Sequence, residues 1–170
     1  MIKVVILGSG NVGTHLFKAF NKKNSEVKIK QWYSRNLKDL APYCDLVKIT
    51  DQLDKLEFAD VYILAVNDDS IHDLSTQLLF SNRLVCHTSG SKPKNELNLK
   101  NRSAVFYPLQ TFSKESEIDF SKIPICLESS NREDMITLKK ISKSLGCTYY
   151  EIDSNQREKL HLAAVFVNNF

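Results

Sequence analysis

The sequence predicts an α/β protein with a doubly wound, mainly parallel sheet. Strand-like apolar runs alternate with helix-like segments along the whole chain. The clearest run, Val61–Val66, is apolar without interruption, as in a parallel strand covered on both faces. A glycine-rich turn, GSGNVG, joins the first strand to the first helix. This pattern favours helices on both faces of the sheet and right-handed crossovers.

The elements follow in order along the chain. A strand is expected at Ile2–Leu7 and a helix at about Val12–Lys22, followed by strands in EVKIKQWYS and DLVKIT. After the strand Val61–Val66, the segment SIHDLSTQLL spaces its apolar residues for one helix face. The remaining strands are expected in RLVCHTSG, AVFYPLQTF, IPICLESS and CTYYEID, with a helix at about Arg132–Leu145 before the last of them.

The final segment, SNQREKLHLAAVFVNNF, is predicted to be a helix with Ser154 as its N-cap. Its apolar residues recur at helical spacing, at Leu160, Ala163, Ala164 and Val167. No glycine or proline closes this helix. We therefore expect a truncated sequence, or a helix that packs on another subunit.

Composition narrows the possible functions. A chain of 170 residues accommodates one well-buried domain. The net charge of +3 and the scattered lysines give no basic stripe, so nucleic acid is not an expected partner. Apolar runs are too short for a signal peptide or a membrane span, which predicts a cytoplasmic protein. The cysteines Cys44, Cys86, Cys126 and Cys147 have no metal-ligand spacing, so we expect buried free thiols and no metal site.

The glycine-rich turn has the spacing of a dinucleotide-binding loop. Gly8 would permit a tight turn, Gly10 would let the backbone approach a pyrophosphate, and Gly13 would let the helix pack closely on the strand. The helix N-terminus can bind phosphate through its free N–H groups, so the side chains of Ser9 and Asn11 are compatible with the loop without being required. The loop residues expected at the cofactor are Gly8, Ser9, Gly10, Asn11, Val12 and Gly13.

The end of the second strand indicates which dinucleotide binds. An NAD site would carry an acidic residue there, whereas this chain has Ser34 and Arg35. A hydroxyl and a guanidinium suit a 2′-phosphate, so we predict NADP(H) as the cofactor. The alternative is that Arg35 is a solvated loop arginine. A methyltransferase is less favoured, because such enzymes usually need an acid at this position for the ribose hydroxyls.

Six segments in order, GSGNVG, YSRN, ADVYILAVNDDSI, HTSGS, YPLQTFS and HLAAVFVNNF, carry a family resemblance. The chain resembles Rossmann-like proteins with a C-terminal domain of unknown function 2520, relatives of pyrroline-5-carboxylate reductase and deazaflavin-dependent NADP oxidoreductases. The resemblance implies an NADP-binding Rossmann domain over residues 1–153. It also implies that residues 154–170 begin an all-helical domain through which the protein forms a homodimer.

The chain departs from its relatives at two positions. They commonly have His-Pro where this chain has Tyr107-Pro108, and the broader hydroxyacid dehydrogenase group has a lysine where Ala164 or Val165 stands here. The resemblance therefore transfers no acid–base role to these positions.

Ligands in an open parallel sheet bind at the carboxyl ends of the strands, which selects further candidates. In relatives, the segment corresponding to Ala65, Val66 and Asn67 runs along the cofactor ribose; a polar turn that caps the next helix is the alternative. His87 and Ser89 follow the next strand and are expected near the nicotinamide. His87 is either a proton donor or a hydrogen-bonded structural residue.

Later segments supply the other candidates for the chemistry. Gln110 and Thr111 could orient a substrate. His161 and Asn168 are seven residues apart on one face of the final helix, as a candidate general acid and a substrate-orienting amide. The alternative for His161 is packing against further helices. His15 and His72 are expected on helix surfaces without a role.

Together these features predict an NADP-dependent oxidoreductase that reduces a small C=O or C=N substrate by hydride transfer. A non-catalytic NADP(H)-binding regulator or sensor remains the alternative.

Overall fold

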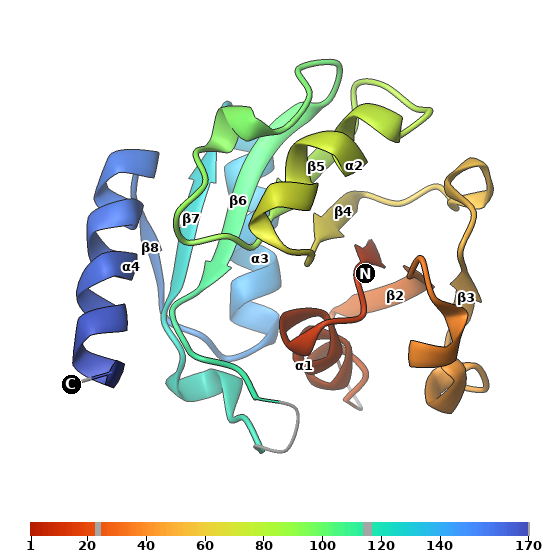
Figure 1. Ribbon diagram of the computed structural model, residues 1–170, viewed down its shortest axis with the longest axis horizontal. Helices are drawn as coiled ribbons and strands as arrows, with labels where there is room; N and C mark the ends of the chain where they lie inside the picture. Colours follow the sequence, from red (N-terminus) through yellow and green to blue (C-terminus); the bar gives the residue numbers. More distant parts are fainter. Residues whose placement is uncertain (23–24, 114–116, 170) are drawn as a thin grey trace.

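The computed structural model describes residues 1–22, 25–113 and 117–169, without the side chains of Asn168 and Asn169. Within these ranges one eight-stranded sheet has the order β3-β2-β1-β4-β5-β6-β7-β8 (Figure 1). Its strands are β1 (Ile2–Leu7), β2 (Val27–Tyr33), β3 (Lys48–Thr50), β4 (Val61–Leu64), β5 (Leu84–His87), β6 (Arg102–Pro108), β7 (Ile125–Ser129) and β8 (Tyr149–Glu151). β1 to β6 are parallel, whereas β7 runs antiparallel to β6 and β8 runs parallel to β7. The predicted α/β class with a mainly parallel sheet is confirmed.

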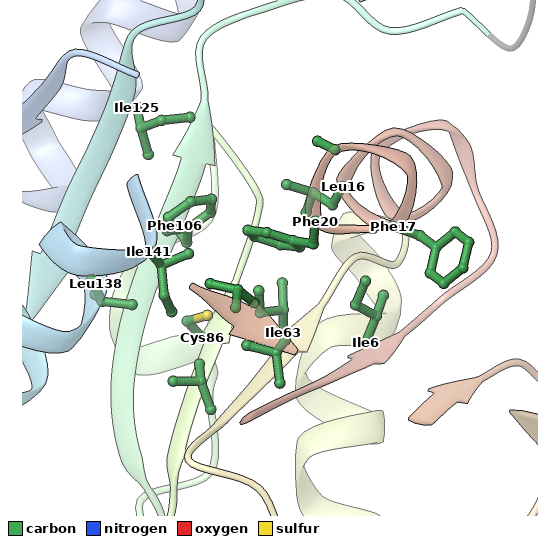
Figure 2. Packing of buried hydrophobic residues seen from close by; sticks show 14 of the residues in the cluster. Ile6, Leu16, Phe17, Phe20, Ile63, Cys86, Phe106, Ile125, Leu138 and Ile141 are labelled. Atoms are coloured by element: carbon green, nitrogen blue, oxygen red, sulfur yellow. The ribbon is translucent and has the colours of Figure 1, made fainter. Parts of the chain in front are cut away.

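Helices cover both faces of the sheet. Helices α1 (Asn11–Phe20) and α3 (Arg132–Ser144) pack on one face in a single apolar cluster. Figure 2 shows Leu16, Phe17 and Phe20 of α1 and Leu138 and Ile141 of α3 around the strand residues. Helix α2 (Ile71–Gln77) packs on the other face against β1, β4 and β5. Both faces of the central strands are thus apolar, which explains the uninterrupted apolar run of β4.

The strand order places a switch point beside β1. β1 pairs with β2 on one side and with β4 on the other, so the chain connections diverge to the two sides of this strand. In an open parallel sheet, such a divergence leaves a crevice at the carboxyl ends of the strands. The loops that follow β1, β2, β4 and β5 meet there.

The reversal at β7 determines where the last helix runs. Because β7 and β8 run opposite to β6, the chain leaves β8 at the amino edge of the parallel strands. Helix α4 (Ser154–Asn169) then returns toward the carboxyl edge, along the side of the sheet away from β3 (Figure 1). It contacts Glu128 of β7 and Tyr107 of β6 through Arg157 and His161. The reversal therefore brings α4 to the ligand-binding edge.

Three local expectations were wrong. The N-cap of α4 is Asp153 rather than Ser154, because the Asp153 carboxylate accepts from the Gln156 N–H at 2.8 Å while the Gln156 side chain accepts from the Asp153 N–H at 3.0 Å. His15 is buried with 4% exposure, since it contacts the loop after β6. Cys44 is exposed, although all four thiols are free as expected.

Candidate functional site

Two glycines allow β1, α1 and β4 to approach one another. Gly8 has φ +118°, a conformation that L residues rarely adopt, and a Cβ added there would overlap the Ala65 carbonyl oxygen. A Cβ at Gly13 would overlap the Gly8 carbonyl oxygen. The Trp32 indole N–H donates to that same oxygen at 2.8 Å and is fully buried. Gly8 and Gly13 are therefore required by packing as well as by any ligand.

Gly10 has a different environment. No atom lies within 4 Å of a Cβ built at Gly10, and its backbone is extended, with φ −72° and ψ −174°. It is the N-cap of α1, whose first turn contains no acidic residue. The unpaired N–H groups and the positive end of the helix dipole therefore face open space, which suits an anion.

Two cavities meet at this helix end. The first, of about 410 Å³, extends from Gly8 to the end of β2 and the α2 helix; the second, of about 280 Å³, extends to the loops after β5 and β6. Together they match the size of small-molecule sites. The residues that line both cavities are Gly10, Ala65, Val66 and Asn67. The predicted residues Ala65, Val66 and Asn67 thus lie between the two cavities.

The first cavity ends in a polar cluster after β2. The buried Ser34 hydroxyl lies 2.8 Å from that of Ser9, and the exposed Arg35 also lines the cavity. Asp39, which we did not predict, lines it too and accepts from Ser9 Oγ at 3.0 Å. The 3₁₀ turn Leu37–Asp39 returns this carboxylate to the cavity, with Asn36 as its N-cap. An acid five residues after Ser34 is only weakly suggested by the Asn-Leu-Lys-Asp turn pattern.

The loop after β6 forms one wall of the second cavity. Asn11 and Val12 line it from α1, Thr88 from the loop after β5, and Gln110 and Phe112 from the loop after β6. The side chains of two α1 residues hold this last loop: Asn11 Nδ2 donates to the Phe112 carbonyl at 2.7 Å, and His15 Nε2 lies 2.8 Å from the Ser113 carbonyl. Asn11 therefore fixes a cavity wall through its side chain. Thr111 is exposed and lines neither cavity.

His87 organises the loop after β5. Its imidazole is fully buried, Nδ1 accepts from the Ser89 N–H at 3.2 Å, and Nε2 therefore donates to the Pro93 carbonyl at 3.2 Å. Burial, aided by the Arg157 guanidinium, lowers the pKa of His87 to about 4. A neutral imidazole with both nitrogens bonded to backbone matches the structural alternative for His87.

Ser89 also acts within this loop. Its hydroxyl accepts from the N–H groups of Ser91 and Lys92 at 3.2 and 3.0 Å, and it lines neither cavity. Ser91 Oγ donates to Asp68 Oδ2 at 2.5 Å, which ties the loop to the turn after β4. The segment HTSGS is thus a rigid wall beside the second cavity.

His161 of α4 reaches the carboxyl end of β6, where its Nδ1 lies 2.8 Å from the Tyr107 hydroxyl. The predicted partner of His161 cannot be placed, because the side chain of Asn168 lies outside the described residues. His72 is exposed, as expected. The fold therefore brings together a Tyr107–His161 pair that no sequence motif indicated.

Comparison with known proteins identifies the family. Residues 3–89 match the family described as coenzyme F420-dependent NADP oxidoreductase, and residues 123–170 match a domain of unknown function, DUF2520. A presumed NADP oxidoreductase from Bacteroides fragilis is 36% identical over 99% of this chain and 67% of its own, with a TM-score of 0.87. The chain belongs to this NADP oxidoreductase family. It is accordingly an NAD(P)-binding, oxidoreductase-like domain.

More distant structures share the fold with this family member. A pyrroline-5-carboxylate reductase from Coxiella burnetii is 16% identical over 98% of this chain and 67% of its own, with a TM-score of 0.71. A reductive aminase from Aspergillus terreus, in complex with NADPH and ethyl-5-oxohexanoate, is 13% identical over 99% of this chain and 61% of its own, with a TM-score of 0.72. The chain spans about two thirds of the length of these proteins. No curated protein matches the sequence significantly.

In the described ranges, no helix is long and apolar enough to cross a membrane. No group of three or more histidine, cysteine, aspartate or glutamate side chains there could hold a metal ion.

The neutral, buried state of His87 predicts a pH-dependent stability. Below about pH 6.5 the unfolded chain protonates this imidazole, whereas the folded protein does so only near pH 4. Between pH 7 and pH 5 this residue should lower the free energy of unfolding by about 2 kcal/mol. Urea unfolding at both pH values measures the loss. His87→Gln should show a smaller loss, while the exposed His72→Gln should match the wild type; equal losses in all three proteins would contradict this account of His87.

Proposed function

We propose that this chain binds NADP(H) across the carboxyl edge of its sheet and, in the full-length protein, reduces a small C=O or C=N substrate. The observation that carries the proposal is the meeting of two cavities at Gly10, beside the N-terminus of α1. A dinucleotide has two nucleoside halves joined by a pyrophosphate, and the site has two compartments joined at an anion-binding helix end. Membership of an NADP oxidoreductase family supports the same conclusion.

The pyrophosphate position follows from the packing of the loop. Gly8 and Gly13 hold the turn tightly against Ala65, so the backbone N–H groups at the start of α1 are fixed before a ligand arrives. Gly10 leaves the space in front of them open. Binding there needs no rearrangement of the loop, and a preorganised site loses little affinity to conformational ordering.

The end of β2 supports NADP(H) over NAD(H). Arg35 is exposed and lines the first cavity, where it can pair with a 2′-phosphate, and Ser34 lines the same cavity. Asp39 opposes this preference, because its carboxylate would repel the phosphate and could accept from a ribose hydroxyl. The preference for NADP(H) therefore depends on whether the attraction of Arg35 for the 2′-phosphate exceeds the repulsion by Asp39.

The second cavity limits the size of the substrate. At about 280 Å³ it accommodates a nicotinamide ring together with a small molecule rather than a large one. Asn67, Thr88 and Gln110 provide hydrogen-bonding groups on its walls, and Val12 and Phe112 provide apolar surface. When bound, NADPH would supply the hydride. The chain itself orients the substrate.

Substitutions at two glycines should separate binding from stability. Gly10→Val fills the pyrophosphate space, so we expect loss of NADPH binding with an unchanged free energy of unfolding. Gly13→Ala is the matched change at a packing glycine: its Cβ collides with the Gly8 carbonyl and should lower the free energy of unfolding by about 1–3 kcal/mol. Quenching of the buried Trp32 measures binding, and urea unfolding measures stability. Normal NADPH binding by a folded Gly10→Val protein would rule out this site.

Cofactor preference should respond in opposite directions to two substitutions after β2. Arg35→Ala removes the partner of the 2′-phosphate and should weaken NADPH binding by roughly ten- to a hundredfold, with NADH binding unchanged. Asp39→Asn removes the repelling carboxylate and should strengthen NADPH binding several-fold. Titrations of both variants with NADPH and with NADH measure these affinities. If Arg35→Ala leaves the ratio of NADPH to NADH affinity unchanged, Arg35 is only a solvated loop residue.

A further inference from the structure

The Tyr107–His161 pair lies near the carboxyl end of β6, and the loop that follows this strand lines the second cavity through Gln110 and Phe112. Tyr107 Oη and His161 Nδ1 are 2.8 Å apart, and the rings meet edge to face with centroids 5.7 Å apart. Tyr107 lies three residues before Gln110, which lines the second cavity. The two partners are 54 residues apart in the sequence, so the fold alone brings them together.

A glycine makes room for the pair. A Cβ added at Gly90 would lie 2.5 Å from His161 Nδ1 and 2.7 Å from Tyr107 Cζ. Gly90 follows Thr88, another residue that lines the second cavity, by two positions. The backbone of the HTSGS loop therefore packs directly on the bonded atoms of the pair, and only glycine permits this contact.

Helix α4 is fixed one turn before His161. Arg157 is fully buried; its guanidinium donates to Glu128 of β7 at 2.5 Å and to the Lys92 carbonyl at 2.5 Å. Ser154 Oγ donates to the same Glu128 carboxylate at 2.8 Å. These bonds join α4 to the sheet and to the HTSGS loop, so the imidazole is held against the Tyr107 hydroxyl in a defined register.

Groups on several elements influence the pKa of the Tyr107 phenol. Burial, together with Cys126 of β7 and Asp68 of the turn after β4, raises the pKa of Tyr107 to about 12, while Arg157 of α4 opposes the rise. His87 of β5, Glu128 of β7 and the Lys92 loop lie around the same helix contact. The phenol therefore keeps its proton at neutral pH. A phenolate left behind in this buried position is unfavourable, so a neighbouring group that returns the proton favours its release to a substrate.

We propose that Tyr107 is the proton donor of the reduction and that His161 reprotonates it. The proposal rests on the reductase function proposed above. As hydride reaches the carbon of the C=O or C=N bond, the Tyr107 O–H bond breaks and an O–H or N–H bond forms on the substrate. The Tyr107 O–H bond forms again with the proton from His161 Nδ1, and the neutral imidazole takes a proton from solvent. One hydride and one proton are consumed in each turnover.

The pair could instead only fasten α4 to the sheet, and the two roles predict different results. If the pair only fastens α4, Tyr107→Phe lowers the melting temperature without changing turnover per folded site. If the pair delivers protons, Tyr107→Phe lowers kcat, leaves NADPH affinity unchanged and removes an ionisation from the pH–rate profile.

The test compares the full-length wild type with Tyr107→Phe, His161→Asn and the double variant. Tyr150→Phe, the same change at an exposed tyrosine of β8, is the control. With NADPH and a panel of small ketones and imines, each single variant should lose about 10²- to 10⁴-fold in kcat. The double variant should lose no more than the worse single variant, because the two groups act in one relay. Tyr150→Phe should match the wild type.

The remaining outcomes are distinguishable. Unchanged kcat in Tyr107→Phe, with active wild type, overturns the proton role and leaves the reductase function intact. Loss of NADPH binding in Tyr107→Phe also overturns it, because the hydroxyl would then be a cofactor ligand. A wild type that binds NADPH but reduces nothing overturns the reductase function and the relay together. In the free protein, ¹⁵N NMR should show that His161 Nδ1 changes its shift in Tyr107→Phe and not in Tyr150→Phe; no change would contradict the hydrogen bond itself.

Discussion

The close approach of three backbone segments at the start of α1 determines most of this site. The Gly8 carbonyl lies so close to Gly13 that only a glycine fits at position 13, and it accepts a hydrogen bond from the Trp32 indole N–H. Ala65, at the end of β4, packs against Gly8 itself. Any side chain at Gly8 or Gly13 would push α1 away from the sheet. The N-terminus of α1 would then no longer point into the junction of the two cavities.

The reversal of the chain after β6 provides the second half of the arrangement. If β7 and β8 were parallel to β6, the chain would leave β8 at the carboxyl edge and α4 would run away from it. Because they are antiparallel to β6, α4 starts at the amino edge and runs toward the site. The buried Arg157 fixes its register through Glu128 and the Lys92 carbonyl, and His161 follows one turn later. The fold thus places a candidate nucleotide site and a candidate proton-transfer pair at the same edge of the sheet.

The sequence predicted those parts of the fold and site that depend on local chemistry. The glycine spacing indicated the loop, and the apolar run of β4 indicated where Ala65, Val66 and Asn67 would emerge. It could not indicate contacts that depend on distant segments. The burial of His15 depends on Ser113, 98 residues away, and the Tyr107–His161 bond depends on the reversal at β7. The Asp153 cap was missed for another reason: the Asp-x-x-Gln box is visible in the sequence, but Ser154 competed for the same role. The homodimer and the boundary at residues 153 and 154 stay predictions.

The central claim is that one dinucleotide occupies both cavities, with its pyrophosphate at Gly10. An NMR titration of backbone amides with NADPH tests it most directly, because the two cavities are lined by separate segments. The account predicts simultaneous shifts in three places: the loop Gly8–Gly13, Ser34 and Arg35 after β2, and Thr88 after β5. The amides of β8 should not move. Shifts confined to one cavity, or no shifts at about 1 mM NADPH, a concentration that detects even weak binding, would contradict it.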